Sequence, residues 1–135
     1  MNVLVDTSVW SLALRRARRI DDAVPRELAE LIREGRVVMI GPVRQELLSG
    51  IKSKPQFEQL RDHLRAFPDL ELESIDYEEA ASAYNRCRER GIQGSNTDFL
   101  ICALAIRRDL AIFTTDGDFK HFARALRFEL YQVRP

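Results

Sequence analysis

Short apolar runs rich in β-branched and aromatic residues alternate along the chain with longer segments in which apolar residues recur every three or four positions. The first pattern is typical of buried strands and the second of amphipathic helices. Strands that alternate with helices form a parallel sheet covered by helices on both faces. The apolar runs predict five strands, at residues 3–5, 37–40, 70–75, 111–114 and 128–131.

Proline and glycine mark the ends of the helices predicted in the first half of the chain. Pro25, Pro42 and Pro55 stand at the starts of helical patterns, where the missing backbone N–H leaves no hydrogen bond unmade. Gly35 and Gly50 end the first two of these helices. We therefore expect three successive helices before the third strand.

Two further helices are predicted after the third strand. Asp76 is expected to cap one that runs towards Gly91, and Ser95 or Asn96 to cap another over residues 97–107. The second of these helices is apolar nearly all round, so we expect it to lie at the centre of the fold.

Four acidic residues stand where such a sheet would gather them. Asp6 and Asp116 each follow a predicted strand, and Glu46 and Asp98 lie in the first turns of predicted helices. In open parallel sheets, ligands bind beyond the carboxyl ends of the strands, where the strand order reverses. If the first and fourth strands are neighbours, Asp6 and Asp116 face each other there. Packed carboxylates repel one another, so a hard cation such as magnesium or manganese is the expected occupant.

Each of the four acids also has a purely structural interpretation. Asp6 is suited to capping the helix that follows it, and Asp98 stands at capping-box spacing from Ser95. Glu46 has the properties of a solvated surface residue, and Asp116 those of a turn residue. Taken singly each acid is ambiguous, and the functional interpretation rests on the four together.

The composition narrows the remaining classes of function. Lys plus Arg (21) balances Asp plus Glu (21), so a polyanion-binding role needs a local basic patch or a metal. Cys87 and Cys102 form no C-x-x-C pair, which is typical of reduced, buried thiols in an intracellular protein. No signal-like or membrane-spanning segment is evident, so we expect a cytoplasmic protein without a membrane partner. His63 and His121 lack the spacing of zinc ligands.

Four sequence blocks carry the acids, at residues 3–10, 42–50, 96–103 and 113–119. They read VLVDTSVW, PVRQELLSG, NTDFLICA and FTTDGDF. Together they resemble the PIN-domain ribonucleases, most closely the VapC-type toxins of bacterial toxin–antitoxin pairs, over essentially the whole chain. The resemblance implies a single α/β domain over residues 1–135, with three α/β/α layers and a central five-stranded, mostly parallel sheet.

By this resemblance Asp6, Glu46, Asp98 and Asp116 correspond to the catalytic, metal-binding acidic quartet of the family. Asp6 and Asp98 are implied to be the most direct Mg²⁺ ligands, with Mn²⁺ as a substitute. Residues expected to line the site behind the quartet are Thr7, Ser8 and Asp118.

The implied activity is the hydrolysis of single-stranded or looped RNA by a magnesium-dependent endoribonuclease. Two cations about 4 Å apart activate a water molecule and clamp the scissile phosphate in such sites. The implied partners are a VapB-like antitoxin, whose C-terminal segment blocks the site, and a second copy of the chain. We expect both interfaces on the apolar faces of helices between Asp22 and Phe67.

Two basic stretches lie outside these motifs. The run Arg15-Arg16-Ala17-Arg18-Arg19 favours a solvated helix face or loop, and a surface that steers RNA or faces the antitoxin is the alternative. Lys120 and His121 follow the acidic turn, within reach of a substrate phosphate if RNA binds there.

Three other classes of protein were weighed against a nuclease. A phosphoacceptor receiver domain needs an acidic pair after its first strand and a lysine after a late strand, whereas Asp6 stands alone and Thr114-Thr115-Asp116 occupies the late position. A phosphohydrolase with an Asp-x-Asp nucleophile motif is disfavoured because Ser8 replaces the second aspartate. A binding module that retains the fold without catalysis is separated from a nuclease only by an activity assay.

Overall fold

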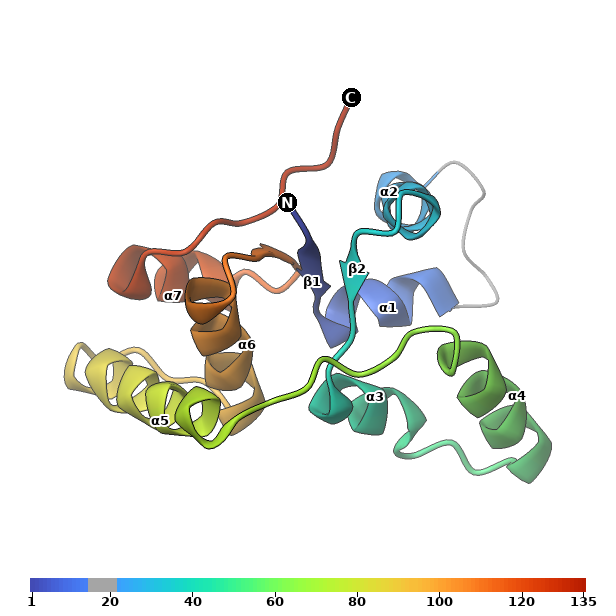
Figure 1. Cartoon of the computed structure of the whole chain (residues 1–135), viewed down its shortest axis with the longest axis horizontal. Helices are drawn as coiled ribbons and strands as arrows, with labels where there is room; N and C mark the ends of the chain where they lie inside the picture. Colours follow the sequence, from blue (N-terminus) through green and yellow to red (C-terminus); the bar gives the residue numbers. More distant parts are fainter. Residues whose placement is uncertain (15–21) are drawn as a thin grey trace.

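A parallel sheet with the first strand at its centre organises the computed structural model, which describes residues 1–14 and 22–135 (Figure 1). Strand β1 (Val3–Val5) lies between β2 (Val37–Val38) and β3 (Ala111–Phe113). Both neighbours are parallel to β1, with Leu4 opposite Val38 on one side and Ile112 on the other. The predicted adjacency of the first and fourth strands is therefore confirmed. The basic run at residues 15–19 lies outside the described residues.

The two outer predicted strands each make only one bridge. Asp69 pairs with Met39 beyond β2, and Leu130 pairs with Ile112 beyond β3, both in parallel. Among the described residues, the sheet thus has three strands where five were predicted, and Asp69 and Leu130 each add a single bridge to it. The prediction of a strand at residues 70–75 is wrong, because residues 70–73 are not in a strand and a helix begins at Ser74.

The described residues form seven helices, which include the helix expected to follow Asp6 and the five predicted between Pro25 and residue 107. They are α1 (Thr7–Leu14), α2 (Ala23–Arg33), α3 (Gly41–Leu48), α4 (Lys54–Leu64), α5 (Ser74–Glu89), α6 (Asn96–Arg107) and α7 (Asp118–Leu126). Helices α1 to α4 gather on one side of the molecule and α5 to α7 on the other (Figure 1). No helix in the described part of the chain has the length and apolar character needed to cross a membrane.

Helix α6 is buried as its sequence predicts. Every residue from Phe99 to Ala105 is buried, and β1 is completely or almost completely enclosed. Phe122 of α7 packs on the ring of Phe99 with 5.0 Å between ring centroids. Cys87 and Cys102 are free and buried, in agreement with the prediction of reduced thiols. The apolar helix and the central strand therefore form a rigid support for the residues at their ends.

Helices α5 and α6 begin with the same local structure, a capping box. Ser95 is the N-cap of α6 and exchanges hydrogen bonds with Asp98, which resolves the choice between Ser95 and Asn96. In α5 the N-cap is Glu73, and Asp76 is the third helical residue. The prediction that Asp76 is the cap itself was therefore wrong by three positions, although its carboxylate does accept a hydrogen bond from the Glu73 backbone N–H at 2.8 Å.

Asp76 also ties the start of α5 to the end of α6. Its carboxylate is fully buried and accepts hydrogen bonds from Arg107 Nε and Arg108 Nη2, both at 2.8 Å. The bonds from Arg108, the Glu73 N–H and Arg107 outweigh the effect of burial and hold the pKa of Asp76 far below its ordinary value. This buried charge is therefore fully compensated.

The chain after α7 is fastened to α2 by a second buried carboxylate. Glu27 accepts hydrogen bonds from Tyr131 Oη at 2.7 Å and from the backbone and guanidinium of Arg134 at 2.9 Å. Burial alone raises the pKa of Glu27, but these hydrogen bonds lower it to about 2. The extended C-terminal segment is thereby held against α2.

Candidate active site

The carboxyl ends of β1 and β3 and the starts of α3 and α6 meet at one edge of the sheet. Strand order reverses there, because β2 and β3 lie on opposite sides of β1. The backbone N–H of Asp6 donates to the carbonyl of Phe113 at 2.9 Å, which fixes the end of one strand against the other. This edge is the position at which open α/β sheets bind ligands.

Asp6 is held by two hydroxyl groups. The residue is buried, with 7% of its surface exposed, and one carboxylate oxygen, Oδ2, accepts hydrogen bonds from Ser8 Oγ at 2.7 Å and Thr114 Oγ1 at 2.8 Å. The backbone carbonyl of Asp6 accepts the first helical hydrogen bonds of α1, from Val9 and Trp10. The carboxylate is therefore oriented across the sheet by hydroxyls, and the start of α1 uses the Asp6 carbonyl.

Asp98 combines its capping role with a position among negative charges. Oδ2 accepts the Ser95 N–H at 3.0 Å, and the residue is half-buried. Burial raises the pKa of Asp98, and the charges of Asp6 and Asp116 raise it further, against the lowering effect of the Ser95 hydrogen bonds. The structural and functional interpretations of Asp98 are therefore compatible. One carboxylate oxygen caps the helix, and the side chain lies near the carboxylates of Asp6 and Asp116.

Asp116 lies in an exposed turn between β3 and α7. Its backbone N–H donates to Thr114 Oγ1 at 3.0 Å, and its Oδ1 accepts the N–H of Asp118 at 2.9 Å. Asp118 is exposed in the first turn of α7, so its described contribution is the backbone N–H that orients Asp116. Thr114 thus links the carboxylate of Asp6 to the backbone of Asp116.

Glu46 lies on α3 and is connected to the acidic edge by a hydrogen bond from the first residue of α1. It is exposed, and its Oε2 accepts a hydrogen bond from Thr7 Oγ1 at 2.8 Å. Thr7 is the first residue of α1 and directly follows Asp6. Glu46 is therefore placed beside the other acids by a contact with the residue next to Asp6.

The hydroxyl groups of Ser8 and Thr114 form a hydrogen-bond network at this edge that the sequence did not predict. Ser8 Oγ accepts the backbone N–H of Thr115 at 3.0 Å and lies 3.2 Å from Thr114 Oγ1. Thr114 was not selected from the sequence, although a threonine directly after a buried strand at the predicted edge is a usable signal. Cys102, one turn beyond Asp98 on α6, has a raised pKa because of burial and then the Asp98 charge. The Cys102 thiol is therefore uncharged and adds no further negative charge near Asp98.

The four acids lie at the same edge of the sheet, but their side chains do not form a complete metal-coordination site in the described structure. Among the described residues, no three acidic, histidine or cysteine side chains converge closely enough to hold a metal ion. Asp6, Asp98 and Asp116 each use one carboxylate oxygen in the hydrogen bonds described above, and within the described residues the other oxygen accepts none. The available donors are all oxygens, which fit a hard divalent cation.

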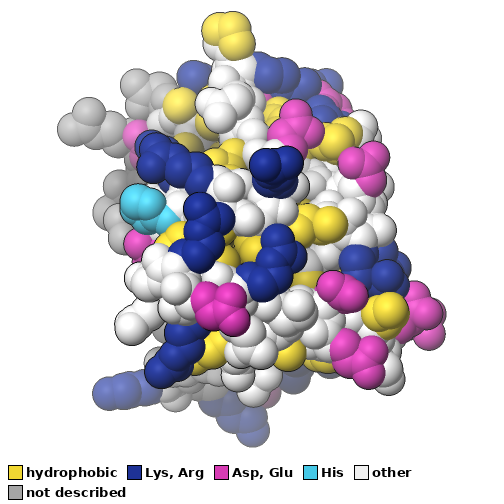
Figure 2. Space-filling model, turned by 90° about the vertical axis from the view of Figure 1, so that its left-hand side faces the viewer, with side chains coloured by type: hydrophobic (Ala, Val, Ile, Leu, Met, Phe, Trp, Pro, Cys, Tyr) yellow, Lys and Arg dark blue, Asp and Glu magenta, His cyan; other side chains and the backbone are white. Residues whose placement is uncertain are grey.

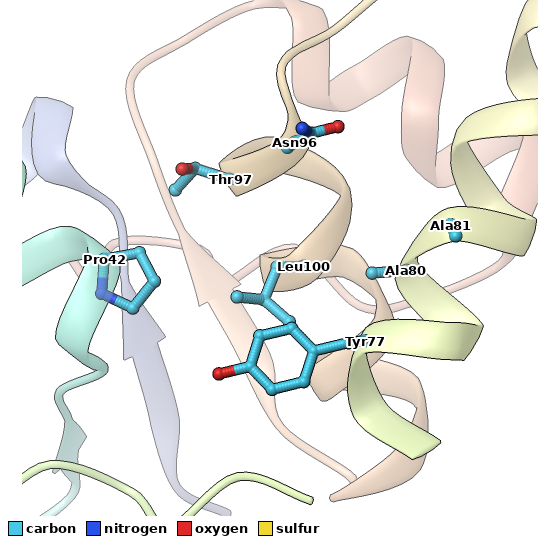
Figure 3. A pocket seen from close by; sticks show the side chains of 7 residues that line it. All are labelled: Pro42, Tyr77, Ala80, Ala81, Asn96, Thr97 and Leu100. Carbon is cyan, nitrogen blue, oxygen red and sulfur yellow. The ribbon is translucent and has the colours of Figure 1, made fainter. Parts of the chain in front are cut away.

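A pocket of about 360 Å³ opens beside this edge, between α3, α5 and the start of α6 (Figure 3). Thr97, the neighbour of Asp98, lies on its rim, and Leu100 and Ala80 form an apolar wall. The ring of Tyr77 extends into the same space and is 54% exposed. An apolar wall and an exposed aromatic ring thus adjoin the acidic edge.

Comparison with known proteins identifies the class to which this fold and site belong. The PIN domain model matches residues 3–125, so the chain belongs to the PIN domain family. More particularly, VapC ribonuclease Mb1587 of Mycobacterium bovis and ribonuclease VapC11 of Mycobacterium tuberculosis are each 32% identical to this chain over 136 residues, which cover 98% of it and 99% of the relative. The predicted resemblance to PIN-domain, VapC-type ribonucleases is confirmed.

Solved structures show the same fold at lower identity. A chain of VapBC2 from Rickettsia felis, bound to a DNA fragment from its promoter, has a TM-score of 0.77 and 20% identity, covering 97% of this chain and 98% of that one. A chain of FitAcB from Neisseria gonorrhoeae has a TM-score of 0.76 and 22% identity, covering 96% of each chain. The predicted α/β class is confirmed.

Proposed function

We propose that this chain is a magnesium-dependent endoribonuclease, the toxin of a toxin–antitoxin pair, and that Asp6, Glu46, Asp98 and Asp116 form its catalytic site. The observation that carries the proposal is that the half-buried Asp98 shares one edge of the sheet with Asp6 and Asp116, an arrangement in which burial and the two neighbouring charges raise its pKa. Such an arrangement costs free energy unless a positive ion occupies it. The curated relatives, which are ribonucleases by name, support the reaction class.

The carboxylates fit a divalent cation by their chemistry. Asp6 and Asp98 are the proposed direct Mg²⁺ ligands because they are the least exposed of the four, and Asp116 and Glu46 complete the set. Mn²⁺ is the proposed substitute, because it accepts the same oxygen ligands. When bound, the cation lowers the pKa of a water molecule and stabilises charge on the phosphate.

The surrounding polar groups position the acids. Ser8 and Thr114 hold one oxygen of Asp6, and the Ser95 N–H holds one oxygen of Asp98, so the remaining oxygens have fixed directions. Thr7 does the same for the exposed carboxylate of Glu46. Hydrogen-bonded partners of ligating carboxylates tune affinity in metal sites generally, so these hydroxyls are proposed as positioning residues.

The proposed protein partner is a VapB-like antitoxin, with homodimerisation as a further proposal. The names of two solved neighbours, VapBC2 and FitAcB, support the antitoxin proposal. A pocket of about 380 Å³ lies between the end of α1 and α4, partly within the region expected for interfaces. Leu14, Ile51 and Leu60 line it together with polar residues, which suits an amphipathic segment of a partner.

The decisive experiment is an RNA cleavage assay with mapping of RNA ends. Purified wild-type protein is expected to cut RNA in Mg²⁺, to stop when a chelator is added and to recover with Mg²⁺ or Mn²⁺. Asp98→Asn is expected to remain folded and to leave the RNA intact. Equal cleavage by the folded Asp98→Asn variant, or undiminished cleavage in chelator, would contradict the proposal.

A further inference from the structure

Basic side chains gather on the side of the molecule formed by α7 and the end of α5 (Figure 2). Helix α7 has one buried face, formed by Phe119, Phe122 and Leu126. Basic residues occupy its exposed positions at helical spacing, over about 10 Å of helix length. These exposed residues are Lys120, His121, Arg124 and, at the C-cap, Arg127.

The charges of this surface are uncompensated within the described residues. Arg107, Arg108 and Arg134 each make ion pairs with buried acids elsewhere in the molecule. In contrast, Lys120 and Arg124 make no ion pair in the described part of the chain, and the same holds for the exposed arginines at the end of α5. Those arginines are Arg86, Arg88 and Arg90. The overall charge of zero therefore conceals a locally positive face.

Arg88, near the end of α5, lines a pocket together with residues of the loop that leads to α6. Its Nη1 donates to Tyr84 Oη at 3.2 Å, which directs the guanidinium along a pocket of about 320 Å³. The loop on the other side of this pocket contains Gly94. A Cβ atom there would lie 2.7 Å from the ring of Phe122, so glycine permits the loop to rest directly on α7. Arg88 and the basic face of α7 thus belong to one continuous surface.

This surface adjoins the candidate active site at two points. Helix α7 begins at Asp118, whose N–H holds Asp116. The loop that rests on α7 ends at Ser95, whose N–H holds Asp98. A phosphate chain that reaches the acidic edge therefore has positive side chains immediately beside it. Because the acids themselves repel a polyanion, such local positive charge is needed to retain one.

We propose that Arg88, Lys120 and Arg124 bind backbone phosphates of single-stranded RNA next to the scissile bond. The inference rests on the proposed function, because it assigns a substrate-binding surface to the same site. Phosphate contacts position a nucleic acid without reading its sequence, so the surface supplies affinity and orientation. Its continuity with the acidic edge favours RNA over an acidic protein segment as the occupant.

The test is RNA binding in the Asp98→Asn background, in which cleavage does not interfere. The variant Arg88→Gln/Lys120→Gln/Arg124→Gln is compared with its parent by fluorescence anisotropy on an unstructured RNA oligonucleotide, in constant Mg²⁺ and 50 to 200 mM salt. Three lost phosphate contacts should reduce the slope of log Kd against log salt by about 2. Over this fourfold range, salt should then weaken binding about 15-fold less than in the parent.

The matched control removes three exposed positive charges from the opposite side of the molecule. Arg26→Gln/Lys52→Gln/Lys54→Gln, which alters α2, the segment before α4 and the first residue of α4, should keep the parental slope. Circular dichroism and thermal unfolding verify that both triple variants are folded. Equal slopes for the two triple variants would overturn the inference, including the case in which a protein partner uses the surface.

Failure of this inference is distinguishable from failure of the proposed function. If the wild type cleaves RNA while the Arg88/Lys120/Arg124 variant binds RNA like its parent, the surface is wrong and the nuclease stands. If the surface variant loses salt-dependent binding while the wild type never cleaves, the surface stands and the proposed reaction is wrong.

Discussion

Asp76 and Asp98 occupy the same position in a helix capping box, but their pKa values are shifted in opposite directions. Each is the third residue of its helix and accepts the backbone N–H of the N-cap residue. Asp76 also meets two guanidinium groups, and its pKa is lowered. Asp98 lies near two carboxylates, and its pKa is raised. The capping motif alone therefore does not reveal whether an aspartate has a structural or a metal-binding role. The neighbouring charged side chains do: arginines surround the structural Asp76, and carboxylates surround the candidate ligand Asp98.

The largest expected difference between the two aspartates is in catalysis. Asp98→Asn should lower the cleavage rate on the order of a thousandfold, or about 4 kcal/mol in activation free energy, because it removes a charge at the reacting centre. Asp76→Asn should stay within about threefold of wild type, since the residue lies at the far end of α6 from the site. Cleavage of a labelled RNA at 20 °C measures both, and comparable losses in two folded variants would remove the contrast.

In stability the order of the two variants reverses. Asp76→Asn should lower the free energy of unfolding by about 3 kcal/mol, because Arg107 and Arg108 lose the buried carboxylate charge to which they bind. Asp98→Asn should leave it unchanged or raise it in metal-free buffer, since repulsion among carboxylates is relieved. Urea denaturation of the two proteins in the presence of chelator measures the difference. A marked destabilisation by Asp98→Asn alone would show that its capping role dominates.

Metal binding should also distinguish the two positions. At a Mg²⁺ concentration of a hundred times Kd, the free energy of unfolding of the wild type should rise by about 2.7 kcal/mol, by mass action on the folded state. The same shift is expected for Asp76→Asn and none for Asp98→Asn. Thermal unfolding with and without Mg²⁺ gives the result, and Na⁺ at equal ionic strength is the control for general screening.

Glu27 extends the comparison to a second compensated acid and makes it pH-dependent. Its folded pKa of about 2 lies below its ordinary 4.5, so the unfolded chain binds more protons between these values and stability increases with pH through the window. The wild type should exceed Glu27→Gln by about 2 kcal/mol above pH 5, and the excess should disappear as pH falls towards 2. Urea titrations from pH 2.5 to 7 test this; a pH-independent difference would show that charge is not the cause.

The smallest expected effect concerns the hydroxyl between two of the acids. Thr114→Val should lower cleavage about tenfold with little change in fold, because Asp6 loses an orienting hydrogen bond. Thr115→Val is the matched control, since Thr115 is exposed and contributes its backbone N–H to Ser8. Steady-state kinetics on the same RNA separates the two variants, and equal rates would exclude a positioning role for Thr114.

The sequence was sufficient to predict the edge at which the acids meet. Strand–helix alternation determines which ends of the elements lie together, and Asp6, Asp98 and Asp116 follow from that rule alone. The burial of α6 was also predictable, because a helix that is apolar on every side must be surrounded by other apolar residues. The shared edge of Asp6 and Asp116 is thus a property of topology.

Contacts made by single side chains across the fold were not predictable. Asp76 looked like an ordinary cap because its two arginine partners lie 31 and 32 residues away in sequence. The strand expected at residues 70–75 did not form, because Glu73 and Asp76 form a capping box and local hydrogen bonding then favours a helix from Ser74. The role of Thr114 likewise depends on the neighbouring strand.

The hydrogen bond between Thr114 and Asp6 spans 108 residues of sequence, which has a consequence for synthesis of the protein. A chain emerging from the ribosome presents Asp6 and Glu46 long before β3 (Ala111–Phe113) exists to pair with β1. Long-range parallel pairing forms late, because closing so large a loop costs entropy before any contact repays it. The acidic edge is therefore completed only when nearly the whole chain has been translated, and every shorter nascent chain lacks it.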